Sequence, residues 1–464
     1  MITLFKSDKK YSLCEIKPAL SKIVAKLINS IEPIGTHLKI IRYEFPCEAC
    51  DISSWMQNQT LSHKFYFSSR DRSFEIAALG QAQSIKSDKP ADLKELFEYC
   101  EDHLSDDNHH LRFYGGISFS PEPSGEEWKA FGQYHFFVPR FELLKNNNEY
   151  FFAFNINFND IKKEIIEGIL KDIEKIQFEI TPKAFSIPKL TSSKNIPNKT
   201  EWDELFKKTL TAIETKAVEK IVLARKSEFV YDAAFDALGL LKKLKEKTPQ
   251  CFHFYYEPIP NISFLGASPE RLFRRGKGRL ESEAIAGTTT RGKNPAEDEK
   301  LRQELLHSQK DNKEHAIVVE SINTNLKPLC LQITVDSAAQ ILELSTGHHL
   351  LTQFNGTPRP TTENYHILQA LHPTPAVAGK PTQEALKFIT NNEPFSRGWY
   401  AGPIGYIGHD GSGFIVAIRC GLVEKNKLSL FAGAGIVKGS ECDSEWGEIE
   451  NKLSAFLQIL NNGT

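Results

Sequence analysis

Residues 400–437 read YAGPIGYIGHDGSGFIVAIRCGLVEKNKLSLFAGAGIV, and this stretch decides the fold class. Its apolar segments are short and are interrupted by Gly, Asp and Asn, which is typical of consecutive strands joined by tight turns. Residues 444–460 (SEWGEIENKLSAFLQIL) follow and repeat apolar side chains at helical spacing. Strands grouped in runs, with helices between the groups, indicate an α+β fold rather than a regular alternation of strand and helix.

The rest of the second half of the chain is organised in the same way. Residues 220–231 (KIVLARKSEFVY) predict one strand, and residues 251–268 predict two strands around a Pro-Asn turn. Residues 296–326 predict a single long helix because apolar side chains recur there at helical spacing. No segment recurs at a fixed period, so we do not expect a repeat architecture.

The first half of the chain mixes strand-like and helical segments. The predicted elements are aromatic-rich strands within 64–80, 111–120 and 133–144 and a helix at 158–177. A polar stretch at 189–206 then separates the two halves, and Asn198 or Thr200 is placed to cap the next helix.

Composition and charge exclude several classes of protein. The chain has 464 residues, with 57 basic and 59 acidic side chains and a net charge of -2, so we expect no general affinity for nucleic acid or membrane. The N-terminal MITLFKSDKKYSLCEIKPAL lacks a long apolar region, and no stretch reaches the ~18 apolar residues of a membrane-spanning helix. Eight scattered cysteines are too few for a disulfide-stapled secreted fold. We therefore expect a cytoplasmic protein in which Cys47 and Cys50 are reduced thiols, although the sequence does not assign them a role.

Two groups of carboxylates have the spacing of a magnesium site. Glu445, Glu448 and Lys452 lie at positions i, i+3 and i+7 and so share one helix face, just after a glycine-rich stretch. Asp311 and Glu314 repeat the i, i+3 spacing in the predicted long helix. Mg²⁺ takes one or two carboxylates together with water and substrate oxygens. The alternative is that these residues form the solvated edge of amphipathic helices.

Two further side chains are candidates for proton transfer. Lys220 directly precedes an apolar run, and burial in a cleft would make it a base by lowering its pKa. Glu270 lies in the turn GASPERL after a strand, where catalytic groups are often placed. The alternatives are a lysine that reaches the strand edge and a surface carboxylate.

Nine motifs together resemble one family. In chain order they are KIVLAR, FLGASPERLF, EAIAGTTTRG, KDNKEH, TGHHLLTQFNG, LHPTPAVAG, RGWYAGPIGY, AIRCG and AGAGIVKGSECDSEWGEIENK. This series, over about residues 200–460, resembles the chorismate-utilising enzymes, which include anthranilate, aminodeoxychorismate, isochorismate and salicylate synthases. The segments FYFSSRDRSFEIAALG, FYGGISF and FGQYHFFVPRFEL add a weaker resemblance to isochorismate synthases of the menaquinone type. The resemblance implies one large α+β unit of two big antiparallel sheets with helices packed outside. Residues 1–195 would be its variable N-terminal part and 196–464 its chorismate-binding catalytic region.

The resemblance also implies roles for individual residues. Lys220 is similar to the general base that activates water, since relatives that use ammonia tend to carry glutamine there, and Glu270 to the general acid that protonates the departing C4 hydroxyl. A site for Mg²⁺, which holds the ring carboxylate of chorismate, is implied for Glu314, Glu445 and Glu448, with Asp311 as a contributor. The remaining implied contacts to substrate are Ala286, Gly287, Thr288, His349, Thr374, Tyr400, Arg419, Gly433 and Lys452. Among these, Tyr400, Arg419 and Lys452 would meet the enolpyruvyl carboxylate, and Ala286 replaces a lysine that attacks the ring in aminodeoxychorismate synthases.

The implied activity is that of an isochorismate synthase, which adds water at C2 of chorismate while the C4 hydroxyl leaves. A salicylate synthase, which then eliminates pyruvate, stays an alternative, and so does a non-catalytic chorismate-binding subunit, because a fold alone does not establish activity. The sequence does not decide whether the product serves menaquinone, siderophore or salicylate formation. No glutaminase partner is implied, and we expect a monomer or weak dimer.

Overall fold

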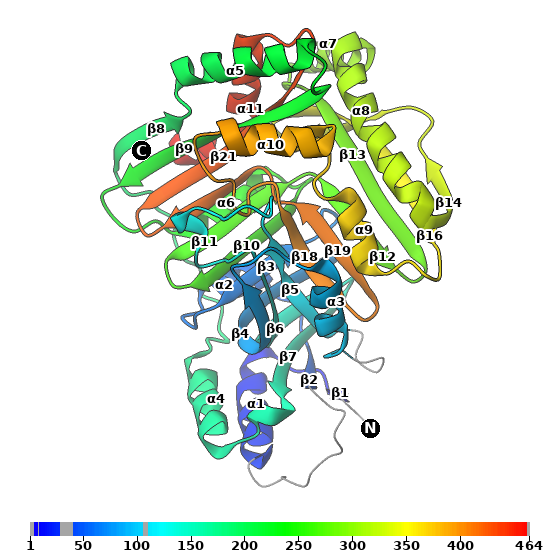
Figure 1. The fold of residues 1–464 in the computed structure, drawn as a ribbon. Helices are drawn as coiled ribbons and strands as arrows, with labels where there is room; N and C mark the ends of the chain where they lie inside the picture. Colours follow the sequence, from blue (N-terminus) through cyan, green and yellow to red (C-terminus); the bar gives the residue numbers. More distant parts are fainter. Residues whose placement is uncertain (1–3, 8, 28–39, 105–109, 462–464) are drawn as a thin grey trace.

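The computed structural model describes residues 4–7, 9–27, 40–104 and 110–461. Its strands form a branched, almost entirely antiparallel sheet system, and helices cover the outside (Figure 1). Within the described residues, β1 and β2 are the one pair of strands that run parallel. The predicted α+β class, with large antiparallel sheets and helices outside, is confirmed.

The sheet system branches at strand β6 (Tyr134–Asn146) because different strands pair along its two edges. One arm leaves β6 in the order β4 (Phe74–Ser87), β3 (Lys64–Ser68), β10 (Phe252–Ile259), β11 (Ile262–Ser268), β20 (Cys420–Glu424), β21 (Lys427–Val437) and β9 (Lys220–Tyr231), with β8 (Leu190–Ile196) and β17 (Gly379–Lys380) on the far edge of β9.

The second arm leaves the other edge of β6. Its order is β5 (Arg112–Ile117), β18 (Pro403–Gly408), β19 (Gly411–Val416), β12 (Arg271–Gly276), β13 (Arg279–Thr289) and β16 (Gly347–Pro358), with β14 (Cys330–Val335) and β15 (Gln340–Leu344) both on β16. Beyond the second arm's start, the same edge of β6 continues into β7 (Glu149–Asn157), β2 (Ile40–Cys47) and β1 (Leu4–Lys6).

Helices pack on these sheets at both ends of the molecule. At the end that holds the N-terminus, α1 (Leu13–Leu27) lies beside α4 (Lys163–Lys175) (Figure 1). The other helices are α2 (Ile52–Gln57), α3 (Leu93–Glu101), α5 (Lys199–Glu214), α6 (Ala237–Lys247), α7 (Pro295–His307), α8 (Gln309–Leu326), α9 (Asn364–Leu371), α10 (Thr382–Asn392) and α11 (Cys442–Asn461). Short 3₁₀ turns span Glu126–Trp128, Phe158–Asp160 and Lys327–Leu329. Helix α8 packs on β13 and helix α11 packs on β21, so each arm has a helix against the strand that will line the site.

The two halves of the sequence share one core. Strand β3 from the first half pairs with β10 from the second, and β5 pairs with β18. Side chains from both halves are fully buried together, as where Tyr256 stacks on Trp399 and meets Phe137. The boundary near residue 195 falls within the pairing of β8 with β9 and remains a prediction.

The single helix predicted over residues 296–326 is wrong. The chain breaks at Ser308, whose extended backbone (φ −65°, ψ 116°) ends α7 and begins α8. The Ser308 hydroxyl accepts a hydrogen bond from the backbone N–H of Asp311, so it caps the second helix. Residues 307–315 are all polar, so the pattern of apolar residues carries no information at the break and did not reveal it.

The polar stretch between the halves is also ordered. Its first part is strand β8, and Asn198 then caps α5 through a capping box with Glu201, as the cap prediction allowed. All eight cysteines are free thiols, and burial together with the charge of Cys50 raises the pKa of Cys47. In the described part of the chain, no helix is long and apolar enough to span a membrane.

Candidate active site

A pocket with a cavity volume of about 60 Å³ lies where the two arms of the sheet system approach each other. Strands β9 and β21 contribute Val222, Ala432, Gly433 and Gly435 to its wall, while β13 and β16 contribute Ile285 to Thr288 and His349. Loops and the two flanking helices supply the remaining wall residues, which are Pro269, Glu270, Ala376, Val377, Tyr400, Ile418, Arg419, Glu314, Glu448 and Lys452. Most of the residues that the sequence singled out therefore meet in one pocket.

Four predicted site residues do not line this pocket: Lys220, Asp311, Thr374 and Glu445. Asp311 lies directly behind the wall, because a side chain at Gly287 would place its Cβ 3.1 Å from the Asp311 Cβ. Thr374 is buried, and its carbonyl accepts the N–H groups of Val377 and Ala378, so it shapes the loop that carries the wall residues Ala376 and Val377.

Lys220 lies beneath the pocket floor, held by one wall residue. Its side chain is fully buried, and its Nζ donates to Oε1 of Glu314 over 2.8 Å. Gly435 makes room for this pair, since a Cβ there would lie 2.3 Å from Glu314 Oε1 and 2.8 Å from Lys220 Cε. The Glu314 carboxylate thus stands between the Lys220 ammonium group and the cavity.

Glu270 has the chemistry of an acid at neutral pH. It is 2% exposed, and its Oε1 has no hydrogen-bond partner among the described residues. Burial raises the pKa of this carboxyl to about 8, and the negative charge of Glu283 adds to the rise, while the charges of Lys220 and Lys452 oppose it. Glu270 therefore carries a proton at pH 7 and faces the same cavity as Glu314.

An arginine from the first half of the sequence supports the Glu270 loop. Arg70 donates to both carboxylate oxygens of Glu283, at 2.7 Å to Oε2, and it also donates to the backbone carbonyl of Pro269. Its guanidinium group stacks on the ring of Phe252 at 4.9 Å. Arg70 thus fixes the residue before Glu270 and neutralises the nearby charge of Glu283.

Hydrogen bonds between Thr288 and His349 and between His349 and Arg419 position the Arg419 guanidinium group on the opposite wall. Thr288 Oγ1 lies 3.0 Å from His349 Nδ1, and Arg419 Nη2 lies 3.1 Å from His349 Nε2. Burial and the charge of Arg419 hold the pKa of His349 well below its ordinary value, so the ring is neutral and Nε2 accepts from the arginine. Among the described residues, Arg419 pairs with no carboxylate, and it has a backbone φ of 51°, in the left-handed region. A partly buried cation held in this way can bind an anion.

Tyr400, Gly433 and Lys452 form a second polar part of the wall. The Lys452 Nζ donates to the Gly433 carbonyl over 2.9 Å and pairs with Glu448 Oε1 at 2.6 Å. Tyr400 stacks on Phe431, and a Cβ at Gly433 would lie 2.9 Å from the Tyr400 hydroxyl oxygen. Glycine at 433 therefore keeps this hydroxyl open to the cavity.

The predicted metal ligands lie near one another, and lysines neutralise them. Glu445 is 1% exposed and accepts from Lys310 Nζ over 2.6 Å, while Glu448 pairs with Lys452 and Glu314 pairs with Lys220. Burial and the charge of Glu448 raise the pKa of Glu445, and burial together with Glu314 and Glu448 raises that of Asp311. Within the described ranges, no three His, Cys, Asp or Glu side chains converge as a ready-made metal site. Glu314, Glu445 and Glu448 each have a lysine as counterion, and a set of hard oxygen donors of this kind fits a divalent cation.

Two residues of this site were missed in the sequence. Lys310 lies one turn before Glu314 and next to Asp311, so helical spacing alone could have placed it with the carboxylates. Arg70 gave no signal of this kind, because its contacts with Glu283 and Pro269 join positions about 200 residues apart in the chain.

Comparison with known proteins agrees with this fold. The family model described as "Chorismate binding enzyme" matches residues 28–461, and the chain belongs to this family. Its curated relatives include isochorismate synthases. The chain is 33% identical to the chloroplastic isochorismate synthase of Catharanthus roseus over 395 residues, covering 83% of this chain and 68% of that enzyme. It is 29% identical to isochorismate synthase MenF of Bacillus subtilis over 467 residues, covering 96% and 97% of the two chains.

Solved structures give the same result at the level of the fold. The menaquinone-specific isochorismate synthase MenF of Escherichia coli superposes with a TM-score of 0.84 at 28% identity, covering 96% of this chain and 99% of that one. Anthranilate synthase component I of Streptococcus pneumoniae superposes with a TM-score of 0.69 at 20% identity, covering 82% and 91%, which is a likeness of fold alone. The family predicted from the nine motifs is confirmed.

Proposed function

We propose that this chain is an isochorismate synthase, which converts chorismate to isochorismate by adding water at C2 while the hydroxyl at C4 departs. The observation that carries the proposal is one pocket lined by a protonated carboxyl group, Glu270, and by Arg419, a half-buried arginine that has no carboxylate partner among the described residues. The first can protonate a leaving hydroxyl, and the second can bind a carboxylate of the substrate. The isochorismate synthases among the relatives support the same reaction.

Glu270 serves as the general acid. A hydroxyl group leaves a ring readily only when it receives a proton, and an acid works best when its pKa lies near the working pH. The pKa of Glu270, about 8, meets that condition, whereas an exposed glutamate would already have lost its proton. The free Oε1 has no competing hydrogen-bond partner among the described residues.

Lys220 serves as the general base that removes a proton from the attacking water. Its Nζ is hydrogen-bonded to Oε1 of Glu314, so release of this hydrogen bond would free the amine to meet the attacking water. Glu314 lines the pocket, and Lys220 is hydrogen-bonded to Glu314, so the base lies next to the pocket wall.

We propose further that Glu314, Glu445 and Glu448 hold Mg²⁺, with Asp311 contributing from behind Gly287. When bound, the cation would offset the charge of these carboxylates and attract the ring carboxylate of chorismate. Burial is the largest cause of the raised pKa values of Glu445 and Asp311, and the charge of Glu448, together with that of Glu314 for Asp311, adds to the rise, which supports a place for a cation among these carboxylates.

The second carboxylate of chorismate, on its enolpyruvyl group, is assigned to Arg419, Tyr400 and Lys452. The neutral His349 keeps the Arg419 guanidinium in place, and Thr288 orients His349. Ala286, Gly287 and Gly433 have small or absent side chains where the wall must approach the ring.

Incubation of the purified protein with chorismate and Mg²⁺ tests the function. The proposal predicts isochorismate at equilibrium with chorismate and no release of pyruvate. Rapid formation of salicylate and pyruvate would identify a salicylate synthase instead. Binding of chorismate without any conversion would identify a non-catalytic subunit. The free thiols support a cytoplasmic location, which we infer for this chain.

A further inference from the structure

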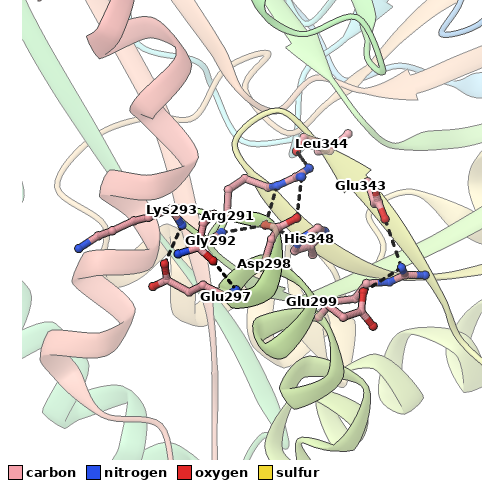
Figure 2. Close-up of polar contacts among 11 residues, drawn as sticks. Arg291, Gly292, Lys293, Glu297, Asp298, Glu299, Glu343, Leu344 and His348 are labelled. Atoms are coloured by element: carbon pink, nitrogen blue, oxygen red, sulfur yellow. Dashed lines mark hydrogen bonds and ion pairs between the residues drawn. The ribbon is translucent and has the colours of Figure 1, made fainter.

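Asp298, outside the pocket, joins three segments of the chain near the substrate wall. It lies in the first turn of α7, which follows the loop after β13. Its carboxylate accepts from the Arg291 guanidinium at 2.9 and 2.7 Å, from the Gly292 N–H at 2.7 Å, and from His348 Nε2 at 3.1 Å. Figure 2 shows Asp298 at the centre of these contacts.

The contacts of Asp298 hold the loop at residues 290–294 against the first turn of α7. A Cβ at Gly292 would lie 2.1 Å from the Asp298 backbone nitrogen, so only glycine allows this approach. Arg291 also donates to the Leu344 carbonyl over 3.1 Å, which ties the same loop to the end of β15 (Figure 2). The four hydrogen bonds hold the pKa of Asp298 at about 2, with the Gly292 N–H as the largest cause, so the carboxylate stays charged.

His348 connects this centre to the substrate wall. It is fully buried, and because a carboxylate can only accept, its Nε2 donates to Asp298. In the pairing of β13 with β16, His348 stands opposite Thr289 and His349 stands opposite Thr288. Fixing His348 therefore also fixes the pairing of His349 with Thr288. His349 contacts Arg419, and Thr288 contacts His349.

The turn between β15 and β16 is also held, through the hydrogen bond from Arg291 to the Leu344 carbonyl. Leu344 pairs with Gly347, and the intervening Thr346 hydroxyl lies 3.4 Å from Arg419 Nη1. A Cβ at Gly347 would lie 2.6 Å from the Thr289 carbonyl oxygen, so the two strands approach closely at this end. The side-chain hydrogen-bond partners of Arg419 named above, Thr346 and His349, thus both lie in the β15–β16 hairpin. Asp298 holds this hairpin directly at His348 and, through Arg291, at Leu344.

We propose that Asp298 is a positioning residue that holds the β15–β16 hairpin against the end of β13, so that Thr346 and His349 aim Arg419 at the substrate carboxylate. The inference rests on the proposed function only in naming that carboxylate as the ligand of Arg419. Asp298 does not line the pocket and acts through His348 and Arg291. Its loss should therefore weaken substrate binding more than it slows the chemical step.

The test compares Asp298→Ala with Glu299→Ala. Glu299 is the next residue on α7, and its carboxylate contacts Arg302 and Gln303 at the exposed helix surface, so it serves as the matched control. We expect Asp298→Ala to raise both the KM and the calorimetric Kd for chorismate about tenfold or more, with kcat within about threefold of wild type. Asp298→Asn should give a smaller rise, because its amide oxygen still accepts from Gly292 and His348. Glu299→Ala should match wild type.

Two results would overturn the inference: an unchanged KM and Kd in Asp298→Ala, or a fall in kcat with KM unchanged. If the alanine variant does not fold, Asp298→Asn decides by the same criteria. Hydrogen exchange of residues 340–352 without substrate should be faster in the Asp298 variants, and equal exchange also contradicts the proposal. Because exchange needs no substrate, it is independent of the proposed function, which fails separately if wild-type protein does not convert chorismate.

Discussion

The Nζ of Lys220 and the Oε1 of Glu314 lie 2.8 Å apart, so the proposed base and a proposed metal ligand are each other's counterion. Both side chains are buried or nearly so, and the pair depends on the absence of a side chain at Gly435. A buried ion pair is costly to break on one side only, because the remaining charge is left without a partner. A metal ion or substrate group that binds Glu314 would therefore also change the contacts of Lys220.

Replacement of Lys220 tests the base directly. Lys220→Ala should reduce kcat for chorismate conversion by about 10²- to 10⁴-fold, the usual contribution of a positioned base, while the protein stays folded. Lys220→Gln, which can still donate to Glu314, should be equally inactive and closer to wild type in its melting temperature. Lys226→Ala is the control, because Lys226 lies on the same strand but pairs with Glu127 and Glu228 outside the pocket. Unchanged turnover in Lys220→Ala would remove the base assignment.

The pH dependence of kcat/KM should report the proton on Glu270. Since the acid must be protonated and its pKa is about 8, kcat/KM should fall as the pH rises through about 8. In Glu270→Gln this alkaline limb should disappear together with about 10²- to 10⁴-fold of the rate. A wild-type profile that stays flat from pH 7 to pH 9.5 would contradict the acid assignment.

The same carboxyl group should lower the stability of the protein at alkaline pH. In the unfolded chain it loses its proton near its ordinary pKa of 4.5, whereas in the folded protein it keeps the proton to about 8. Between these values the folded state binds more protons, so this group makes the free energy of unfolding fall as pH rises. Glu270→Gln should be more stable than wild type in urea at pH 8 and closer to it at pH 5. If Glu270→Gln differs from wild type in free energy of unfolding by the same amount at pH 5 and pH 8, the raised pKa of the Glu270 carboxyl is contradicted.

Removal of Arg70, which does not itself line the pocket, should change the pKa of Glu270. In Arg70→Ala the charge of Glu283 loses its counterion, so the pKa of Glu270 should rise and the alkaline limb of kcat/KM should move to higher pH. Arg72→Ala is the control, since Arg72 is nearby in sequence and its side chain donates to the carbonyl of Lys245. A limb that stays in place, or one that moves to lower pH, would show that Arg70 does not act through Glu283.

The sequence predicted the fold class, the family and most wall residues because these depend on local pattern and motif. Lys220, Glu270 and Arg419 each lie inside a motif, so their positions were readable. The break at Ser308 was not, because it lies in the polar run 307–315, where apolar spacing gives no information. The support that Arg70 gives to Glu270 and the network around Asp298 were also missed, because both depend on contacts between distant segments. Nor could spacing show that lysines neutralise the carboxylates, since Lys310 and Glu445 lie on different helices.

The magnesium proposal predicts a shift in the metal requirement. Glu445→Gln should raise the Mg²⁺ concentration needed for half-maximal activity by about tenfold or more, because one charged oxygen donor is lost. Glu450→Gln on the same helix is the control, as Glu450 pairs with Arg225 away from the pocket. Treatment with EDTA should also weaken chorismate binding in calorimetry. An unaltered metal titration in Glu445→Gln would exclude that ligand.

Turnover of chorismate in water labelled with ¹⁸O tests the central claim most directly. If Lys220 activates water for attack at C2 while Glu270 protonates the hydroxyl that leaves C4, isochorismate should carry ¹⁸O at C2, as shown by mass spectrometry and by the shift of the C2 resonance in NMR. Isochorismate that keeps the original oxygen, or a failure to consume chorismate with Mg²⁺ present, would contradict the account.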